Sequence, residues 1–479
     1  ADHILSKGFN MLLIEKEINF PKYKGKDSLL GHFGQKVQEL IHDGDIPVRF
    51  VITRSDDSGY KCELGVLSDY SSFSLPSSSS IFNFQQRQYE NTSQFNTVLL
   101  VPTGIGAEVG GHSGDGGPLS RLLAATCDNL ITHPNVVNAA DINELPENAL
   151  FVEGSVITRL LMGTISLQKV RANRVMLVLD KHEDKFIYEC AINSASAARA
   201  ALGLDCPLVV LMDDKVLMHA LYSSSGRAVG RIEYLERLCE VLQENRNQFD
   251  AVALSSLIKV PDNFHNDYFQ KEDMVNPWGG VEAMLTHAVS LIFDVPSAHS
   301  PMMTSREIMD LNVGVVDPRK AAEAVSTTYL HCILKGLQRS PRIIRNPTIH
   351  GNSGLLTATD ISCLVIPDSC VGLPTLAAIE QGIPVIAVKE NKNRMRNNLE
   401  ELPFAPGKFF MVENYWEAAG VMNALKAGVA PESVRRPLAH TTVLDANNQI
   451  KTYTNRQLNL DEIEDENSPY LKIASSFDK

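Results

Sequence analysis

The chain contains the apolar run Thr97-Val-Leu-Leu-Val-Pro102, directly followed by Thr103-Gly-Ile-Gly-Ala-Glu108-Val-Gly-Gly-His112-Ser-Gly-Asp115-Gly-Gly-Pro118. The apolar run is typical of a buried strand, and a helix-like segment from Leu119 to Cys127 follows the glycines. Six glycines within a dozen residues let the backbone turn sharply and bring N–H groups close to a ligand. Strand, glycine-rich loop and helix together predict a unit of an α/β fold with a ligand site at the loop.

The same alternation of strand-like and helix-like segments continues over residues 96–450. This pattern predicts an α/β core with a largely parallel, Rossmann-like sheet. We expect two lobes, 96–300 with the glycine-rich loop and 301–450. The expected strands are Val98–Pro102, Arg174–Asp180, Pro207–Met212, Ala251–Ser255, Cys363–Pro367, Pro384–Val388 and Phe409–Val412. The expected helices are Arg231–Asn245, Val281–Ile292, Pro318–Gln338 and Tyr415–Ala427.

Three further segments flank this core. Residues 1–67 predict a small α+β module, with a strand from Phe9, an amphipathic helix over 28–42 and a hairpin over 48–67. Residues 68–95 are rich in Ser, Gln and Asn and predict a flexible linker, because such a segment buries little apolar area. Residues 451–479 include the acidic run from Asp461 and predict a surface or disordered tail.

Composition restricts the class of protein. The net charge of −13 disfavours nonspecific binding to nucleic acid or to anionic lipid. No apolar run approaches the roughly 20 residues needed to cross a bilayer, and the N-terminus lacks the apolar core of a signal peptide. The eight cysteines form no CxxC pair, which indicates reduced thiols in an intracellular compartment. We therefore expect a soluble intracellular protein whose partners are a small-molecule substrate and further copies of itself, a homo-oligomer.

The glycine-rich loop supplies the first candidate site residues. A carboxylate pair and an imidazole among the glycines suit proton transfer, so Glu108, His112 and Asp115 are candidate catalytic residues. Backbone N–H groups of the loop would contact an anionic group of the substrate, and the glycines assigned to this role are Gly104, Gly106, Gly110 and Gly111.

Other polar bends follow expected strands, and the carboxyl ends of parallel strands gather ligands. Asn276-Pro-Trp-Gly-Gly-Val-Glu282 opens a helix, where free N–H groups form an anion site. The candidate substrate-binding residues are His133, Asn135, Asn138, Asn276, Trp278, Gly279, Gly280, Glu282, His350 and Asn352. We interpret Glu153 as a helix cap and His287 as a structural residue.

Two more side chains are candidates for catalysis, each with a structural alternative. His299 lies among small residues in a proline-bounded loop, which suits a general base or a pocket wall. A solvated loop is the alternative. Cys370 follows an expected strand at a helix start, where a thiol pKa falls and the thiolate acts as a nucleophile. A small buried core residue is the alternative.

The sequence leaves the cofactor open. Gly104-x-Gly106-x-x-x-Gly110 is one residue longer than the dinucleotide fingerprint, and Ile131-Thr-His-Pro-Asn135 offers no acidic residue for a ribose. NAD(P) is therefore an alternative rather than the preferred cofactor. A divalent metal is another alternative if the scattered histidines converge, although no pair has the close spacing of a zinc site.

Three motifs point to a known family: Pro102-Thr-Gly-Ile-Gly-Ala-Glu-Val-Gly-Gly-His112, Thr132-His-Pro-Asn-Val-Val-Asn138 and Asn276-Pro-Trp-Gly-Gly-Val-Glu-Ala283. Over about residues 96–450 the chain resembles an uncharacterised family, domain of unknown function 3326, whose members occur in microbes and photosynthetic organisms. The resemblance implies no activity. It does imply that the N-terminal module and the linker are additions to a self-standing core, and it fits a location in the plastid stroma as well as in the cytoplasm.

We conclude from the sequence that the chain is an enzyme acting on a small polar or anionic metabolite. Acid–base chemistry of the isomerase, racemase or lyase type is preferred. An NAD(P)-dependent oxidoreductase and a non-catalytic metabolite-binding protein are the two alternatives. All three require that the scattered polar bends line one pocket.

Overall fold

The computed structural model describes residues 10–25, 27–70, 73, 80–261, 263–309, 312–326, 328–345 and 354–451. Two compact units divide the chain, Ala1–Gly428 and Val429–Lys479. In the second unit, the described residues form a short 3-10 helix, η5 (Pro431–Val434), and the paired strands β22 (Val443–Leu444) and β23 (Ile450–Lys451). The acidic tail beyond residue 451, and the candidates His350 and Asn352, lie outside the described residues.

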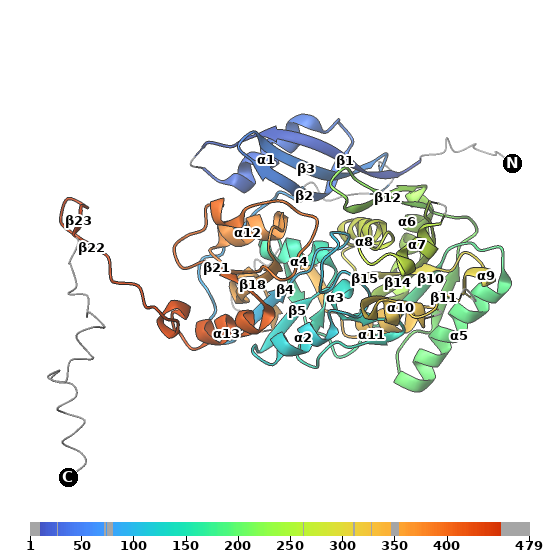
Figure 1. Cartoon of the computed structure of the whole chain (residues 1–479). Helices are drawn as coiled ribbons and strands as arrows, with labels where there is room; N and C mark the ends of the chain where they lie inside the picture. The colour runs from blue at the N-terminus through green and yellow to red at the C-terminus, as the bar shows by residue number, and fades with distance from the viewer. Residues whose placement is uncertain are drawn as a thin grey trace, which may run out of the picture. The chain divides into compact units, whose positions relative to one another are not determined.

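The first unit is a mixed α/β structure built on a six-stranded parallel sheet (Figure 1). Its order is β21-β20-β18-β4-β5-β8, so the strands that follow β4 add on one side and the C-terminal strands add on the other. The strands are β4 (Asn96–Leu99), β5 (Asn129–Thr132), β8 (Ala149–Phe151), β18 (Ile361–Pro367), β20 (Val385–Val388) and β21 (Phe409–Val412). Residues 96–151 and 361–412 thus share one sheet, and the expected boundary at residue 300 does not separate two sheets.

A ten-stranded mixed sheet forms the other half of the unit, with the order β11-β10-β14-β12-β13-β1-β3-β2-β19 and with β15 paired to β14. Strands β10, β11, β14 and β15 are parallel to one another, and the N-terminal strands are antiparallel. Their bounds are β1 (Leu12–Pro21), β2 (Ile46–Asp56), β3 (Gly59–Ser68), β10 (Val175–Leu179), β11 (Leu208–Leu211), β12 (Leu217–Tyr222), β13 (Ala228–Glu233), β14 (Ala251–Lys259), β15 (Ser297–Met302) and β19 (Val371–Gly372).

The N-terminal module is joined to the core through this mixed sheet. β1 pairs with β13, with Leu13 opposite Ile232, so the sheet runs without a break from the module into the core. Part of the segment expected to be a linker is also held in place. Arg87 donates hydrogen bonds to the carbonyls of Ile361 (2.8 Å) and Gln381 (2.9 Å) at the base of the parallel sheet.

Helices pack on the sheets, and smaller strand pairs complete the unit. α2 contacts α13 and α4 contacts α12, and Figure 1 shows the second pair above the parallel strands and the first below. The helices are α1 (Leu29–Leu40), α2 (Gly117–Ala124), α3 (Pro134–Val137), α4 (Gly154–Leu161), α5 (Lys185–Leu202), α6 (Leu235–Glu244), α7 (Phe264–Gln270), α8 (Gly279–Phe293), α9 (Arg306–Met309), α10 (Ala321–Ala324), α11 (Leu330–Gln338), α12 (Leu373–Gln381) and α13 (Tyr415–Lys426). The remaining strands are β6 (Asn138–Ala139), β7 (Ile142–Asn143), β9 (Ile165–Gln168), β16 (Arg342–Arg345) and β17 (Leu355–Leu356). Short 3-10 turns are η1 (Arg246–Gln248), η2 (Pro318–Lys320), η3 (Ala358–Asp360) and η4 (Leu399–Glu401).

The seven expected strands of the core are confirmed within a few residues, but the single helix expected over 318–338 is wrong. Asp317 does cap its start by accepting from the Arg319 N–H, yet the segment breaks between α10 and α11. At the break, the hydroxyls of Ser326 and Thr328 donate to Asp141, and Tyr329 has φ of 55°. Hydroxyl groups that bond elsewhere and a left-handed residue end the helix. None of the helices in the described residues is both long and apolar enough to cross a bilayer.

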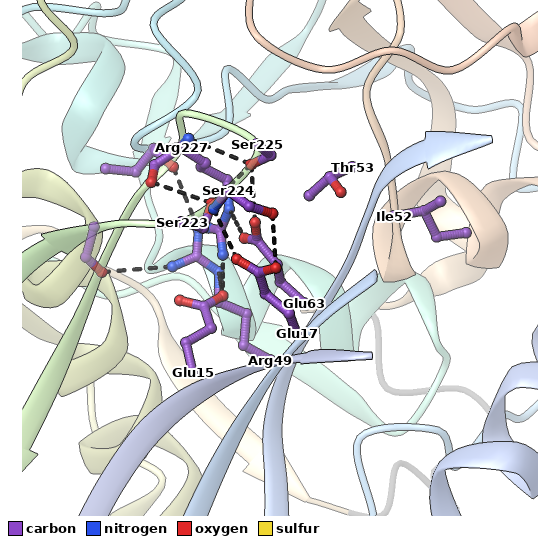
Figure 2. A network of polar contacts seen from close by, with 12 residues as sticks. Glu15, Glu17, Arg49, Ile52, Thr53, Glu63, Ser223, Ser224, Ser225 and Arg227 are labelled. Atoms are coloured by element: carbon purple, nitrogen blue, oxygen red, sulfur yellow. Dashed lines mark hydrogen bonds and ion pairs between the residues drawn. The ribbon is translucent and has the colours of Figure 1, made fainter. Parts of the chain in front are cut away.

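A buried ionic cluster ties the N-terminal strands to the loop before β13 (Figure 2). We call it the Arg227 cluster. The fully buried Arg227 pairs with Glu15 of β1 and Glu63 of β3, and Ser225 donates to Glu63 at 2.9 Å. Arg49 of β2 lies 3.9 Å from Glu15. Charges removed from water are tolerated only when they are paired, so this cluster fixes the position of the module on the core.

Candidate functional site

A cavity of about 210 Å³, which we call cavity 1, lies beside α8 and β15 and beyond the C-terminal ends of β5 and β8. It collects polar groups from distant parts of the sequence. The polar and aromatic side chains that line it are Thr103, Ser113, His133, Asn135, Asn138, Glu153, His265, Phe269, Asn276, Trp278, Glu282, Thr286, His287, His299, Ser300, Thr304, Glu323 and Tyr329. Four of the expected polar segments therefore reach one pocket: the glycine-rich loop, the loop after β5, the start of α8 and the segment around His299.

One face of α8 forms a wall of cavity 1. Gly279, Glu282, Ala283, Thr286 and His287 all line the cavity, and their spacing of three to four residues places them on one side of the helix. The helix therefore aligns a carboxylate and an imidazole along the same wall.

The first histidine–carboxylate pair consists of His299 on β15 and Glu282 on α8. Their Nδ1 and Oε2 atoms are 3.0 Å apart, and the His299 side chain is 1% exposed. The other ring nitrogen of His299, Nε2, is buried and has no hydrogen-bond partner. Since Glu282 holds Nδ1, the ring is oriented with one nitrogen left for a ligand.

The second pair consists of Glu153 and His287. Glu153 precedes α4 and caps it by accepting from the backbone N–H of Ser155 at 2.9 Å. Its Oε1 forms an ion pair with His287 Nδ1 and accepts from the Thr286 hydroxyl at 3.3 Å. Burial opposes ionisation of Glu153, but His287 and the Ser155 hydroxyl outweigh it and lower its pKa to about 2. Glu153 is thus a carboxylate that orients a second imidazole.

His133 lies near the Glu153–His287 pair and stays uncharged at neutral pH. It follows β5, and its Nε2 accepts the Val101 N–H at 3.2 Å. Burial, partly offset by Glu153, lowers the pKa of His133 to about 4. A neutral imidazole that accepts at Nε2 carries its proton at Nδ1, so His133 is a fixed donor at that nitrogen.

A third carboxylate backs the cavity. Glu323 of α10 accepts from the Ser113 N–H at 2.7 Å and from Asn276 Nδ2 at 3.1 Å. Burial raises the pKa of Glu323. Tyr268, itself buried, lies beside this group and its hydroxyl is 2.8 Å from His112 Nδ1. The glycine-rich loop therefore reaches cavity 1 through Ser113, not through His112.

The catalytic candidates of the loop are placed behind the cavity or away from it. His112 is buried against Tyr268, and burial lowers its pKa to about 4. Asp115 accepts from the His112 N–H at 3.3 Å, and burial raises its pKa to about 7. Glu108 is exposed and pairs with Arg319 at 2.9 Å. None of these three lines cavity 1.

The glycines of the loop serve packing. A Cβ on Gly104 would lie 2.6 Å from the Ala228 carbonyl oxygen, and one on Gly111 would lie 2.0 Å from the Ala107 carbonyl oxygen. Gly106 and Gly110 have positive φ and close neighbours at Val275 and Val101. Tight turns and close approach to protein backbone explain these positions, so they offer no open cradle for a phosphate.

The start of α8 is also partly filled. Asn276 Oδ1 accepts from the N–H groups of Trp278 (3.0 Å) and Gly279 (3.2 Å), which the sequence analysis assigned to a ligand. Gly280 packs against β13, where a Cβ would lie 2.2 Å from the Ala228 carbonyl oxygen. Asn276 and Gly279 line cavity 1 even so, and Trp278 packs its ring edge-on against Tyr268 at 5.3 Å. This helix start positions the wall rather than holding an anion.

The two asparagines after β5 line cavity 1, but each already uses part of its side-chain amide in hydrogen bonds within the protein. Asn135 Nδ2 donates to the carbonyls of Gly110 at 2.6 Å and Val101 at 3.2 Å. Asn138 Oδ1 accepts from Asn143 Nδ2 at 3.0 Å. The hydrogen bond from Asn135 to the Gly110 carbonyl holds the glycine-rich loop next to cavity 1.

Cys370 lies in a second cavity of about 140 Å³, which we call cavity 2. It shares five lining residues with cavity 1, namely Thr103, His133, Gly154, Ala283 and His287. Burial raises the pKa of the Cys370 thiol. A thiol that resists ionisation is a poor nucleophile, so the helix-start interpretation gives way to the buried-core alternative.

Glu153, His287 and Glu323 were not among the residues predicted to bind or react, yet all three line cavity 1. Glu153 and His287 are far apart in the chain, and each has an ordinary structural explanation when considered alone, as a cap and as a helix residue. Only their direct contact in the wall of cavity 1 shows that they form a pair. In the described residues, no group of three or more His, Cys, Asp or Glu side chains is arranged to hold a metal ion.

Comparisons with known proteins agree with the resemblance. A curated relative, described as an uncharacterized lipoprotein of Synechococcus, is 33% identical over 344 residues, which cover 71% of this chain and 92% of the relative. No solved structure matches the chain. The family model described as protein of unknown function (DUF3326) matches residues 96–435, which include both histidine–carboxylate pairs. The chain therefore belongs to the DUF3326 family.

Proposed function

We propose that the chain is an enzyme that moves protons on a small polar metabolite bound in cavity 1, by isomerase-, racemase- or lyase-type chemistry. The observation that carries this proposal is that two of the imidazoles that line cavity 1 have Nδ1 next to a carboxylate, His299 in a hydrogen bond with Glu282 and His287 in an ion pair with the buried Glu153. A histidine oriented in this way accepts a proton at Nε2, and the carboxylate stabilises the imidazolium that forms.

Two such histidines allow two-base chemistry. One imidazole removes a proton from a carbon of the substrate while the other, protonated beforehand, returns a proton to a different face or atom. His299 is the preferred base, because its Nε2 is buried and has no protein partner. His287 is the second base, and His133 donates from Nδ1 to orient the substrate.

The charge of the wall restricts the substrate. Glu153, Glu282 and Glu323 line cavity 1, and among the described residues that line it there is no Lys or Arg. Glu323, whose pKa burial raises, would donate a hydrogen bond when protonated. This supports a substrate whose part in cavity 1 is polar and not strongly anionic, such as a hydroxy, keto or amide group.

The strand order supports the Rossmann-like interpretation of the parallel sheet. In doubly wound sheets the ligand binds outside the carboxyl ends of the strands where the order reverses. Here the order reverses between β4 and β18, and Thr103, which follows β4, lines both cavities. The filled positions next to Gly104 and Gly111 speak against NAD(P) at the loop. A homo-oligomer in the cytoplasm or plastid stroma stays a prediction from the sequence.

The test begins with mass spectrometry of metabolites retained by gently purified protein. Each candidate is then incubated with the protein in D2O, and loss of C–H signals is followed by NMR. We expect one carbon to exchange, and we expect His299→Gln to slow that exchange about 100-fold or more. Retention of a metabolite that never exchanges would contradict the enzyme and support the metabolite-binding alternative.

A further inference from the structure

We propose that cavity 2 binds the apolar, anionic part of an elongated ligand, an organic acid with an aliphatic body, whose reacting polar part lies in cavity 1. The proposal rests on the proposed function, because it assigns the second half of the same substrate. It adds a substrate class and a specificity wall that cavity 1 alone does not give.

The position of cavity 2 is the first argument. Pro102 and Thr103, after β4, and Ile366 and Cys370, at the end of β18 and just after it, line it. These are the two strands between which the order of the parallel sheet reverses. A parallel sheet leaves its natural crevice at that point, outside the carboxyl ends of the strands.

Continuity with cavity 1 is the second argument. His133, His287 and Thr103 line both cavities, so a ligand that passes these side chains would occupy both. His287 is one of the two proposed bases. A ligand with its body in cavity 2 would therefore bring its next atoms to the site of proton transfer.

The chemistry of the wall is the third argument. Most of it is aliphatic or aromatic, including Val51, Phe50, Ile105, Leu291, Leu373 and Met395. The charged side chains are Arg49 and Arg159, and among the described residues that line cavity 2 there is no Asp or Glu. Cavity 1 has the opposite character, with three carboxylates. An apolar body that carries a negative group matches cavity 2 and not cavity 1.

Arg159 offers a free contact for that negative group. Its Nη1 pairs with Asp294 at 2.7 Å and its Nη2 donates to the Ser290 carbonyl at 3.1 Å. Asp294 also pairs with Arg345, so two guanidinium groups share this one carboxylate. The buried Nε of Arg159 has no hydrogen-bond partner. An anionic oxygen in cavity 2 would satisfy that donor.

Strand β2 supplies one wall of cavity 2 through residues 48–51. The family match begins at residue 96, so this wall lies outside the part of the chain that the family model covers. The same 344 residues cover less of this chain than of the Synechococcus relative, which is therefore the shorter protein. We infer that the N-terminal module sets which ligand body this chain accepts.

The test is calorimetric titration of the full chain with hexanoate, octanoate and decanoate, and with octylamine as the charge control. We expect affinity to rise about fourfold for each added methylene until the cavity is full, and octylamine to bind at least tenfold more weakly than octanoate. Affinity that does not depend on chain length, or octylamine that binds as tightly, would overturn the proposal.

Two matched variant pairs locate the binding. Val51→Trp fills cavity 2 and should weaken octanoate at least tenfold, whereas Arg54→Trp, on the exposed part of the same strand, should not. Arg159→Met should weaken octanoate about tenfold, and Arg345→Met, which removes the second cation from Asp294 but no donor that lines cavity 2, should weaken it by a clearly smaller factor. Equal effects within either pair would overturn the proposal.

A third variant separates this inference from the proposed function. His299→Gln, in cavity 1 only, should leave octanoate affinity within threefold while it slows proton exchange. If octanoate binds in cavity 2 but the protein exchanges no metabolite proton, cavity 2 stands as a binding site and the proposed enzyme activity is contradicted. If the protein exchanges metabolite protons but does not bind octanoate, the proposed role of cavity 2 is contradicted and the proposed enzyme activity stands.

Discussion

The Arg227 cluster and cavity 1 are two buried groups of charge with different surroundings. Arg227 is enclosed by Glu15 and Glu63, and none of these three lines either cavity (Figure 2). His299 and His287 also pair with carboxylates, but both face open volume. Each group leaves a buried polar atom without a partner, Arg227 Nη1 in one and His299 Nε2 in the other. An unpaired buried atom is therefore not enough to propose a site, and we propose one only where the residue that carries the atom also lines a cavity.

Substitution of Arg227 should have the largest effect on stability and tests this comparison most directly. We expect Arg227→Met to lower the free energy of unfolding by about 3–5 kcal/mol, because it leaves Glu63 buried without its cation and Glu15 with only the more distant Arg49. Urea denaturation followed by circular dichroism measures the change. Arg231→Met is the control, since Arg231 pairs with Glu233 at the surface and should cost less than about 1 kcal/mol. Equal losses in the two variants would show that the cluster does not hold the module.

Acid should affect the neutral histidines around cavity 1. Burial lowers the pKa of His112 and of His133 to about 4, below the ordinary value of 6.5. Between those values the unfolded chain binds these protons and the folded chain does not, so stability falls as pH falls from 6.5 to 4.

Each of these histidines contributes up to about 1.4 kcal/mol per pH unit. Thermal unfolding of His133→Asn from pH 4 to pH 7 should show a shallower dependence than the wild type, by one proton. A His133→Asn slope equal to that of the wild type would mean that His133 is charged in the folded protein.

Asp115 should act in the opposite direction. Burial raises its pKa to about 7, from an ordinary value of 3.8. The folded chain therefore holds a proton that the unfolded chain releases, and this group costs stability as pH rises from about 4 to 7. Asp115→Asn mimics the neutral acid, so its stability relative to the wild type should increase over that range. The same thermal series measures it, and a difference that does not change with pH would contradict the buried neutral carboxyl.

Glu108 should give the smallest effect. It is exposed and paired with Arg319, so Glu108→Gln should change stability by less than about 1 kcal/mol and proton exchange by less than twofold. Urea denaturation and exchange in D2O test both. A large loss of exchange would return the glycine-rich loop to the catalytic role that its sequence suggests.

Local patterns in the sequence were enough to predict much of the fold. Continuous apolar runs predicted β14, β18 and β20, and the helix start expected at Pro318 is confirmed, with Asp317 as its cap. The break before Tyr329 was not predicted, because it depends on hydroxyls that bond to Asp141, nearly two hundred residues earlier. Nor does the sequence show that β4 pairs with β18, since strands β10 to β15 of the mixed sheet lie between them in the sequence.

The sequence named many of the residues that line cavity 1, and fewer of the contacts between them. His299 and Glu282 were both named, and they form a pair. His112 and Asp115 were predicted to be catalytic because they lie among glycines. Those glycines pack against protein, and His112 and Asp115 form hydrogen bonds inside the protein. Glu153 and His287 carry no local signal, because each fits its own helix without the other.

Hydrogen exchange with the two histidine variants tests the two-base proposal most directly. The protein is incubated in D2O with the metabolite that it retains. His299→Gln should abolish exchange at one proton position, or of one stereoisomer, and leave exchange at the other. His287→Gln should have the reverse effect. Complementary losses are the result expected of two bases on opposite sides of one substrate. Equal loss in both variants would contradict it, as would unchanged exchange in both.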